Sequence, residues 1–215
     1  MTGTVRTVDG RVAGRRGQAT RQKLLDCLSD MLSSSPYRDV KVIDVARKAG
    51  TSPATFYQYF PDVEGAVLEL ADTMAKEGGQ LTERVADRSW TGKAGAQTAE
   101  ELVEGFLAFW RKHDAILRVV DLAAAEGDKR FAKLRTKLLT PVSGMLTDAV
   151  KEQQAKGRVD QDVNPAAVAG SLVTLLTGVA GHRQGFTAWG AKQADIKPTL
   201  TLLVHLAVTG RKPTR

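Results

Sequence analysis

Uncharged hydrogen-bonding side chains gather in one short segment of this 215-residue sequence: Thr51, Ser52, Thr55, Tyr57 and Gln58. Hydroxyl and amide groups of this kind can contact base edges and phosphate oxygens of DNA. At helical spacing, Phe56 and either Tyr59 or Phe60 can point inward, which leaves the polar set on the outer surface. The segment therefore suits a helix that lies in the major groove of DNA.

Two short helices joined by a glycine turn are predicted between residues 42 and 60. Apolar residues at helical spacing give the first helix one buried face: Val42, Val45, Ala46 and Ala49. Gly50 follows them, where a residue free to adopt positive φ can end a helix and turn the chain. Ser52 is a good N-cap and Pro53 suits the first helical position, so the second helix begins there. This pattern is a helix-turn-helix, although an ordinary helical hairpin has the same spacing.

The order of the residues favours the helix-turn-helix. The stretch AGTSPATFYQYFPDVEGAV, preceded by VIDVA, resembles the DNA-binding domain of TetR-family transcriptional regulators, over about residues 15 to 71. The resemblance assigns Ser52, Thr55, Tyr57 and Gln58 to the recognition helix, and it places Tyr57 and Tyr59 where family members often reach phosphates or bases. The predicted DNA-binding residues are Arg15, Arg16, Lys41, Thr51, Ser52, Thr55, Tyr57, Gln58 and Tyr59.

Three positions depart from the family pattern. Family members often carry a lysine shortly after the motif, where it meets a phosphate, but Val63 occupies that position here. The first helix commonly begins with Ser or Thr and has a polar residue one turn in, whereas this sequence has Lys41 and Ile43. Lys41 can still attract the DNA backbone. Ile43 cannot donate a hydrogen bond, so any DNA contact that it makes is expected to be with a thymine methyl group.

The basic residues are concentrated at the N-terminus of a chain with net charge +7 and a pI near 9.6. They are Arg6, Arg11, Arg15, Arg16, Arg21 and Lys23, and Asp9 is the only acidic residue among them. Several glycines oppose helix formation there, so residues 1–16 are predicted to be a flexible basic arm. Such arms can enter the minor groove or attract phosphates. A solvated tail without function is the alternative.

The whole chain is predicted to be all α, because no segment alternates as a strand does. Helices are expected at residues 18–34, 42–49, 53–60, 62–86, 98–112, 114–125, 128–156, 164–186 and 195–209. That order matches the TetR fold, which implies a helix-turn-helix domain at residues 17–62 and a helical effector-binding and dimerisation domain at residues 63–215. Residues 87–97, with two glycines, are predicted to be a mobile connection.

Large apolar side chains in the second domain could line an effector cavity. The predicted pocket residues are Phe106, Phe109, Trp110, Leu117, Val120, Met145, Thr174 and His182. By analogy with TetR-like regulators, the ligand would be a hydrophobic or aromatic small molecule. The alternative is that these residues fill the core and that His182 is a structural histidine.

A stripe of small residues between positions 170 and 181 would let another helix approach closely. The predicted dimer interface consists of Gly170, Thr177, Gly178, Gly181, Leu203 and Leu206. In the resembled family such helices form a four-helix interface across a two-fold axis, although an intramolecular contact would explain the same stripe. Two recognition helices about 34–36 Å apart would need a pseudo-palindromic operator.

The expected function is that of a homodimeric repressor released from double-stranded DNA by an effector. A DNA-binding protein without small-molecule input and a helical module that does not bind DNA are the alternatives.

Other functional classes find little support in the sequence. The N-terminus lacks the apolar core of a signal peptide, and no apolar run predicts a membrane span, so a cytoplasmic protein without a membrane partner is expected. The single Cys27 cannot form an intramolecular disulfide and is expected to be a core residue. The three histidines lie far apart, and no phosphate-binding loop or nucleophile elbow is present. Neither an enzyme nor a metal or other cofactor is therefore predicted.

Overall fold

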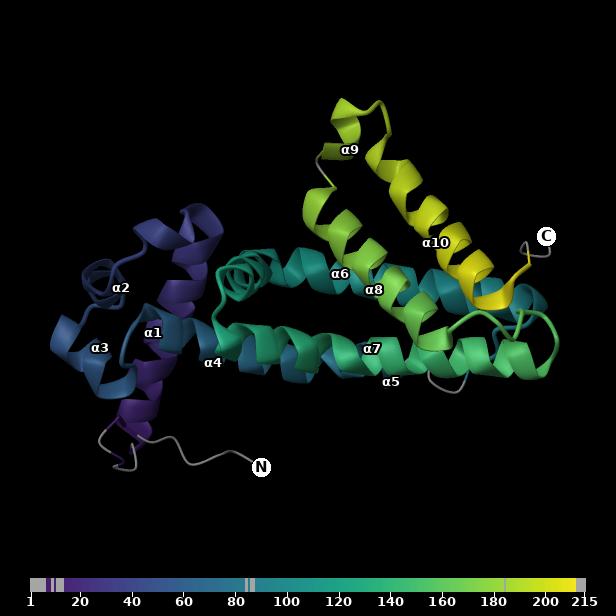
Figure 1. Ribbon diagram of the computed structural model, residues 1–215. Coiled ribbons are helices and arrows are strands. Elements are labelled where there is room, and N and C mark those ends of the chain that lie inside the picture. Colours follow the sequence, from purple (N-terminus) through teal and green to yellow (C-terminus); the bar gives the residue numbers. More distant parts are fainter. Residues whose placement is uncertain are drawn as a thin grey trace. The chain divides into compact units, whose positions relative to one another are not determined.

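The computed structural model describes residues 7, 8, 10, 14–83, 85, 88–183 and 185–211 (Figure 1). The regular elements of these residues are helices, so the predicted all-α fold is confirmed. They are α1 (Arg15–Ser34), the 3₁₀ helix η1 (Tyr37–Asp39), α2 (Val42–Lys48), α3 (Pro53–Tyr59), α4 (Val63–Gly78), α5 (Gln80–Glu83), α6 (Gly92–Ala125), α7 (Lys129–Ala155), α8 (Pro165–His182), α9 (Gly185–Ala188) and α10 (Gln193–Thr209).

The chain divides into two compact units. Unit 1 consists of Met1–Met74 and Asp114–Leu134, and unit 2 consists of Ala75–His113 and Arg135–Arg215. The predicted domain boundary between residues 62 and 63 lies at the start of α4, whereas unit 1 continues into that helix and includes parts of α6 and α7. The assignment of DNA binding to residues 17–62 and of effector binding to residues 63–215 stays a prediction.

In unit 1 the first three α-helices pack around a small apolar core. α1 contributes one buried face, made of Leu24, Leu25, Leu28 and Leu32. Val45 and Ala46 of α2 and Phe56 of α3 are completely buried against it. Each large side chain buried in this way stabilises the fold by about 1.5–3 kcal/mol relative to its exposed state. Cys27 is a free, half-buried thiol on the same helix. This core fixes the orientation of α2 and α3.

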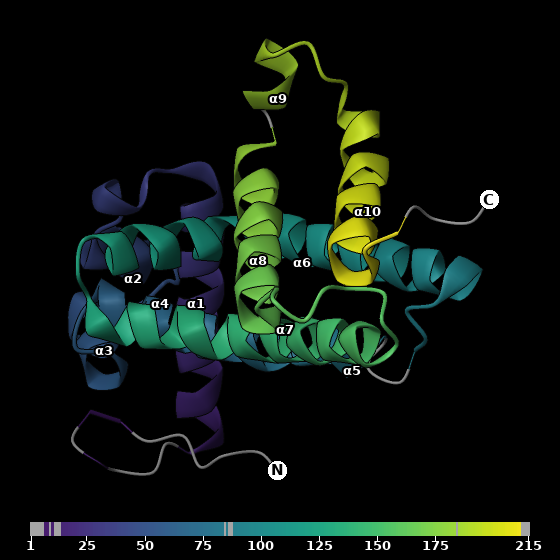
Figure 2. The ribbon, with the colours of Figure 1, turned by 45° about the vertical axis from the view of Figure 1, so that its right-hand side comes forward.

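In unit 2, α8 and α10 lie side by side (Figure 1 and Figure 2). Leu172 and Leu176 of α8 and Val204 and Val208 of α10 are buried. α8 begins at an N-cap, where Asn164 Oδ1 accepts hydrogen bonds from the two following backbone N–H groups at 3.0 and 3.1 Å. Each of the two helices also has exposed residues, among them Gly178 of α8 and Leu203 of α10.

The longest helix, α6, differs from its prediction. Two helices separated near residue 113 were expected, with a mobile connection before residue 98, but one helix runs without a break from Gly92 to Ala125. No proline interrupts it. His113, at the expected break, is buried and contacts the ring of Phe109 on the preceding turn at a centroid distance of 4.6 Å. The prediction of a mobile connection at residues 92–97 is therefore wrong.

Two other predicted helices are shorter than expected. The helix expected at residues 62–86 is divided into α4 and α5 near Gly78, whose missing side chain lets Leu138 of α7 approach closely. A Cβ atom at Gly78 would collide with that leucine. The helix expected at residues 164–186 ends at His182 and is followed by the short α9. The turn η1 was not predicted.

Candidate nucleic-acid interface

The helix α3 begins as its sequence predicts. The Thr55 backbone N–H donates to Ser52 Oγ at 3.2 Å, and Pro53 occupies the first turn. Gly50 has φ 67°, a conformation that a residue with a side chain rarely adopts, and it ends the turn after α2. These local interactions set the direction of α3 relative to α2.

The two sides of α3 have opposite character. Phe56 and Phe60 are buried, with 0% and 2% exposure, and their ring centroids lie 5.3 Å apart. Tyr57 is 53% exposed and Gln58 is also exposed. Tyr59 is half-buried, so it is less accessible than its neighbours. The outward side of α3 therefore presents an aromatic hydroxyl and an amide.

The three predicted hydroxyl residues at the start of α3 are partly used by the fold itself. The hydroxyl oxygens of Ser52 and Thr55 lie 3.0 Å apart, and Thr51 donates to the Ser52 carbonyl at 3.2 Å. Thr51 and Thr55 are half-buried, whereas Ser52 is exposed. Ser52 thus acts first as the helix cap. Among the predicted contact residues of α3, Tyr57 and Gln58 remain the most available.

Ala54 is a contact candidate that the sequence interpretation missed. It is exposed on α3 and precedes Tyr57 and Gln58 by three and four residues, so all three share one face. Its methyl group could meet a thymine methyl. The helical spacing of Ala54 with Tyr57 and Gln58 is the sequence signal that identifies it.

The three residues that depart from the family pattern, Lys41, Ile43 and Val63, have different environments. Ile43 is 50% exposed, which leaves its side chain available for an apolar contact. Lys41 is exposed at the N-cap position. Val63, in contrast, is buried at the start of α4 and is part of the core. A phosphate contact at that position is therefore replaced by packing.

The basic residues of the N-terminus have different environments. Arg15 and Arg16 are exposed in the first turn of α1, which begins three residues earlier than predicted. The backbone N–H of Val8 donates to the carbonyl of Gln58 at 2.8 Å, so this residue lies beside the end of α3. Arg6 and Arg11 lie outside the described residues, as does most of the predicted flexible arm.

Arg21, one of the basic residues concentrated near the N-terminus, is an internal residue. Its guanidinium pairs with Glu69 of α4 and lies 5.1 Å from the centroid of the Phe60 ring. Burial lowers the pKa of this guanidinium, and its side chain is only 16% exposed. Arg21 therefore connects α1 to α4 and to the end of α3 instead of reaching DNA.

Replacement of Glu69 by glutamine should destabilise unit 1 by about 1–3 kcal/mol, because it leaves the poorly hydrated Arg21 charge without its carboxylate. Urea unfolding measures the change. Glu126→Gln is the matched control, since Glu126 pairs with Arg38 where both side chains are more than half exposed, and a change within about 0.5 kcal/mol is expected. Equal destabilisation by both substitutions would contradict the structural role of the Arg21 pair.

The predicted effector residues do not form one group. Phe106 and Trp110 are buried and stack with their ring centroids 4.6 Å apart, and Phe109 is buried beside them. Leu117 and Val120 are buried in unit 1. In unit 2, Met145 is half-buried, while Thr174 and His182 are exposed on α8. The buried members have the environment of core residues, and their role in ligand binding stays a prediction.

A titratable cluster connects α4 to α6 within unit 2. Glu77 Oε2 lies 2.6 Å from Lys112 Nζ and 3.1 Å from His113 Nε2. The hydrogen bond from Lys112 lowers the pKa of Glu77. Burial lowers the pKa of His113, although the Glu77 charge acts in the opposite direction. The folded protein therefore favours the neutral form of His113 more than the unfolded chain does.

Acidification should therefore destabilise unit 2. The unfolded chain takes up a proton at His113 below about pH 6.5, whereas the folded protein does so only at lower pH, so protons favour unfolding in this interval. The melting temperature is expected to fall as the pH drops from neutral through this interval. His113→Gln should reduce that fall, and His182→Gln, at an exposed histidine, should not. An identical pH dependence in all three proteins would refute the role of His113.

The outward side of α8 is made of small residues. Gly170, Gly178 and Gly181 are exposed, and a Cβ atom added to any of them would have no neighbour within 4 Å. Leu203 of α10 is 41% exposed, and Leu206 is half-buried. Thr177 differs from the other predicted interface residues, because its side chain is buried and its hydroxyl donates to the Thr174 carbonyl. Most of the predicted dimer residues therefore lie on accessible surface of one unit.

α8 is also apolar overall. It is the one helix in the described part of the chain that could cross a membrane by length and composition, with mean hydropathy 1.3 over 18 residues. A third of that window is buried inside the protein. A helix that packs in a subunit interface has the same composition, so this observation does not identify a membrane span.

Comparisons with known proteins extend over nearly the whole chain. The family described as "Bacterial regulatory proteins, tetR family" matches residues 24–70, and "Tetracyclin repressor-like, C-terminal domain" matches residues 81–215. The HTH-type transcriptional regulator EthR of Mycobacterium tuberculosis is 23% identical over 206 residues, which cover 93% of this chain and 90% of EthR.

Solved structures share the fold at low sequence identity. FadR of Bacillus halodurans, a fatty acid degradation regulator, has a TM-score of 0.66 at 13% identity, with coverage of 90% of this chain and 96% of FadR. The FadR repressor of Thermus thermophilus, solved with lauroyl-CoA, has a TM-score of 0.55 at 16% identity, with coverage of 91% and 98%. The fold and the order of its parts are therefore those of these regulators.

Proposed function

This chain belongs to the TetR family of bacterial regulatory proteins, and from that premise we propose that it is a homodimeric repressor released from its operator by a small molecule. Family membership makes it a DNA-binding transcription regulator and not an enzyme. The repressor function, the dimer, the effector, the form of the operator and a cytoplasmic location are the proposed parts.

The observation that carries the proposal is the division of α3 into two sides. Phe56 and Phe60 anchor the helix in the core, and Tyr57 and Gln58 face outward. The exposed Ile43 of α2 and the exposed Arg15 and Arg16 of α1 add an apolar contact and positive charge. Together they offer what major-groove binding needs: groups for base edges on one helix and cations for phosphates.

The dimer is proposed from the outward sides of α8 and α10. Exposed glycines on α8 permit close approach of a second helix, and the exposed Leu203 supplies apolar area on α10. The same helices of a second subunit would complete a four-helix contact about a two-fold axis. A two-fold dimer favours a pseudo-palindromic operator.

A hydrophobic effector is supported by one regulator of similar fold, the FadR repressor of Thermus thermophilus, whose structure was solved in complex with lauroyl-CoA. Such a ligand would act by differential affinity. If it binds better to a conformation whose recognition helices do not match the two half-sites, it lowers operator affinity by that difference. The tight stacking of Phe106 on Trp110 instead favours a second candidate, in which the protein binds DNA without small-molecule input.

Selection of DNA fragments by the purified protein, followed by affinity measurements at increasing salt, tests the proposal. We expect a pseudo-palindromic fragment and an affinity that falls steeply as salt rises, because phosphate contacts release counterions. An asymmetric fragment would overturn the two-fold dimer on DNA. No sequence preference together with no salt dependence would leave a helical module that does not bind DNA.

A further inference from the structure

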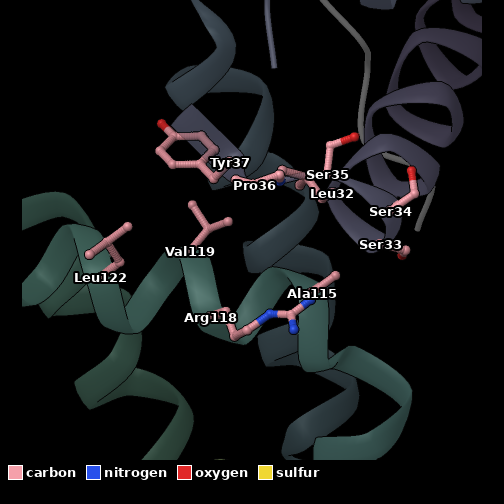
Figure 3. A pocket seen from close by; sticks show the side chains of 10 residues that line it. All are labelled: Leu32, Ser33, Ser34, Ser35, Pro36, Tyr37, Ala115, Arg118, Val119 and Leu122. Carbon is pink, nitrogen blue, oxygen red and sulfur yellow. The ribbon is translucent and has the colours of Figure 1, made fainter. Parts of the chain in front are cut away.

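A cleft of about 470 Å³ opens in unit 1, where the end of α1 and the turn η1 face α6 (Figure 3). Its walls are Leu32, Ser33, Ser34, Ser35, Pro36 and Tyr37 on one side and Ala115, Arg118, Val119 and Leu122 of α6 on the other. Small-molecule sites typically occupy roughly 300–1,000 Å³, so the volume suits a ligand of modest size. None of the predicted effector residues lines this cleft.

Part of the cleft lining is apolar. Val119 and Leu32 are almost completely buried, and Val119 points toward Leu32 and Pro36 (Figure 3). Leu122 lines the cleft on the Tyr37 side and is 38% exposed. An exposed leucine next to a concave surface loses water contact when an apolar group covers it, which favours a ligand with an apolar body.

The α6 side of the cleft also carries a cation with unused donors. Arg118 is 63% exposed, and its Nη1 atom lies 3.2 Å from Asp114 Oδ2. A guanidinium has five N–H donors, so this single contact leaves most of them available. The neighbouring Ser33 and Ser34 hydroxyls donate to carbonyls of their own helix, at 3.0 and 3.2 Å. Arg118 is therefore the group that would hold a carboxylate, and in bidentate geometry it would do so strongly.

We propose that this cleft binds an amphipathic carboxylate, with the carboxylate on Arg118 and the apolar body against Val119 and Leu122, and that the bound ligand changes operator affinity. The regulatory half of this inference rests on the proposed function. The binding half does not, because it follows from the cleft alone.

The position of the cleft provides the physical connection to DNA binding. α1, which ends at the cleft, packs against α2 and α3. η1 is connected to the end of α6 by the ion pair between Arg38 and Glu126. The Tyr37 ring lines the cleft while its hydroxyl points away from it (Figure 3). That hydroxyl is buried, which raises the pKa of Tyr37, and the nearby Glu64 carboxylate of α4 adds to the effect.

A ligand between α1 and α6 would therefore contact elements that hold α2, α3 and the start of α4 in place. Two arrangements of this junction that differ in ligand affinity would also differ in the position of the recognition helix. The ligand would shift their populations by its difference in affinity for the two.

Isothermal titration of the full chain with phenylbutyrate, and with the uncharged phenylbutyramide as its isosteric control, tests the binding half. Phenylbutyrate is expected to bind and the amide to bind at least about tenfold more weakly, because a charge-assisted hydrogen bond is lost. Arg118→Gln should weaken phenylbutyrate binding by a similar factor, and Leu122→Ser should also weaken it. Arg111→Gln, at another exposed arginine of α6, should not.

The alternative outcomes overturn the inference. If phenylbutyrate and phenylbutyramide bind equally well, the cleft does not recognise a carboxylate. No binding at millimolar concentration, or binding that persists in both Arg118→Gln and Leu122→Ser, would show that the cleft is not the site. Operator affinity measured with and without phenylbutyrate then tests regulation, and an unchanged affinity would overturn that half. Failure of the ligand-free protein to bind DNA would refute the proposed function while the titration still decides the cleft.

Discussion

Phe56→Ala is expected to lower the free energy of unfolding of unit 1 by about 3–5 kcal/mol, the range for truncation of a fully buried phenylalanine. Phe56 has no exposed surface, and its ring contacts those of Phe60 and Tyr57 at centroid distances of 5.3 and 6.0 Å. Its removal leaves a cavity at the point where α3 attaches to α1 and α2. A loss of this size removes much of the stability of a domain.

The aromatic residues of the chain allow this loss to be localised. Its three tyrosines lie in unit 1 and its three tryptophans lie in unit 2: Tyr37, Tyr57 and Tyr59, and Trp90, Trp110 and Trp189. Urea unfolding of Phe56→Ala should therefore begin earlier when followed by tyrosine absorbance than when followed by tryptophan fluorescence. Ile43→Ala, at the half-exposed residue of α2, is the control and should change stability by less than about 0.5–1 kcal/mol. Similar losses in both variants would contradict the inward assignment of Phe56.

Local signals were sufficient for the helix-turn-helix. The positive φ of Gly50, the cap at Ser52 and the first-turn Pro53 depend on residues within one turn of each other, and each was predicted from its neighbours alone. The inward side of α3 follows from the spacing of Phe56 and Phe60 in the same way. Because these features require no distant partner, a single sequence contains them.

Contacts between distant segments were not predictable in the same way. Arg21 is separated from Glu69 by 48 residues, and its sequence neighbours indicate only that it belongs to a basic stretch near the N-terminus. His113 is adjacent to a charged residue, yet its contacts with Phe109 and Glu77 bury it in an unbroken α6. Such environments are determined by how whole helices pack against one another, and helical periodicity in the sequence does not encode that packing.

The candidate ligand sites show the same limit. Phe106 and Trp110 are large and apolar, which is equally expected of a core and of a pocket, and the structure stacks them against each other. The cleft at Arg118, in contrast, is formed by two distant segments, residues 32–37 and 115–122, and its serines and arginine have no distinctive spacing in the sequence. A cavity is a property of packing, so its residues become recognisable only when the helices are placed.

Tyr57→Ala is expected to weaken operator binding by about tenfold to a hundredfold, which corresponds to the loss of roughly 1–3 kcal/mol per specific contact. Tyr57 is the exposed aromatic residue of α3, and its hydroxyl can meet a base edge or a phosphate. Because the side chain is 53% exposed, its truncation should change the stability of unit 1 far less than Phe56→Ala does. Fluorescence anisotropy with the selected operator measures the affinity.

Three comparisons determine what Tyr57 contacts. Tyr57→Phe keeps the ring and removes the hydroxyl, so a loss as large as that of Tyr57→Ala would assign the contact to the oxygen. A loss confined to the operator would indicate a base contact, whereas an equal loss on unrelated DNA would indicate a phosphate. Trp189→Ala removes an aromatic side chain that is 79% exposed in unit 2 and should leave operator affinity unchanged. Wild-type affinity in Tyr57→Ala would exclude this side chain from the DNA interface, and binding would then depend on Gln58, Ile43 and the exposed arginines of α1.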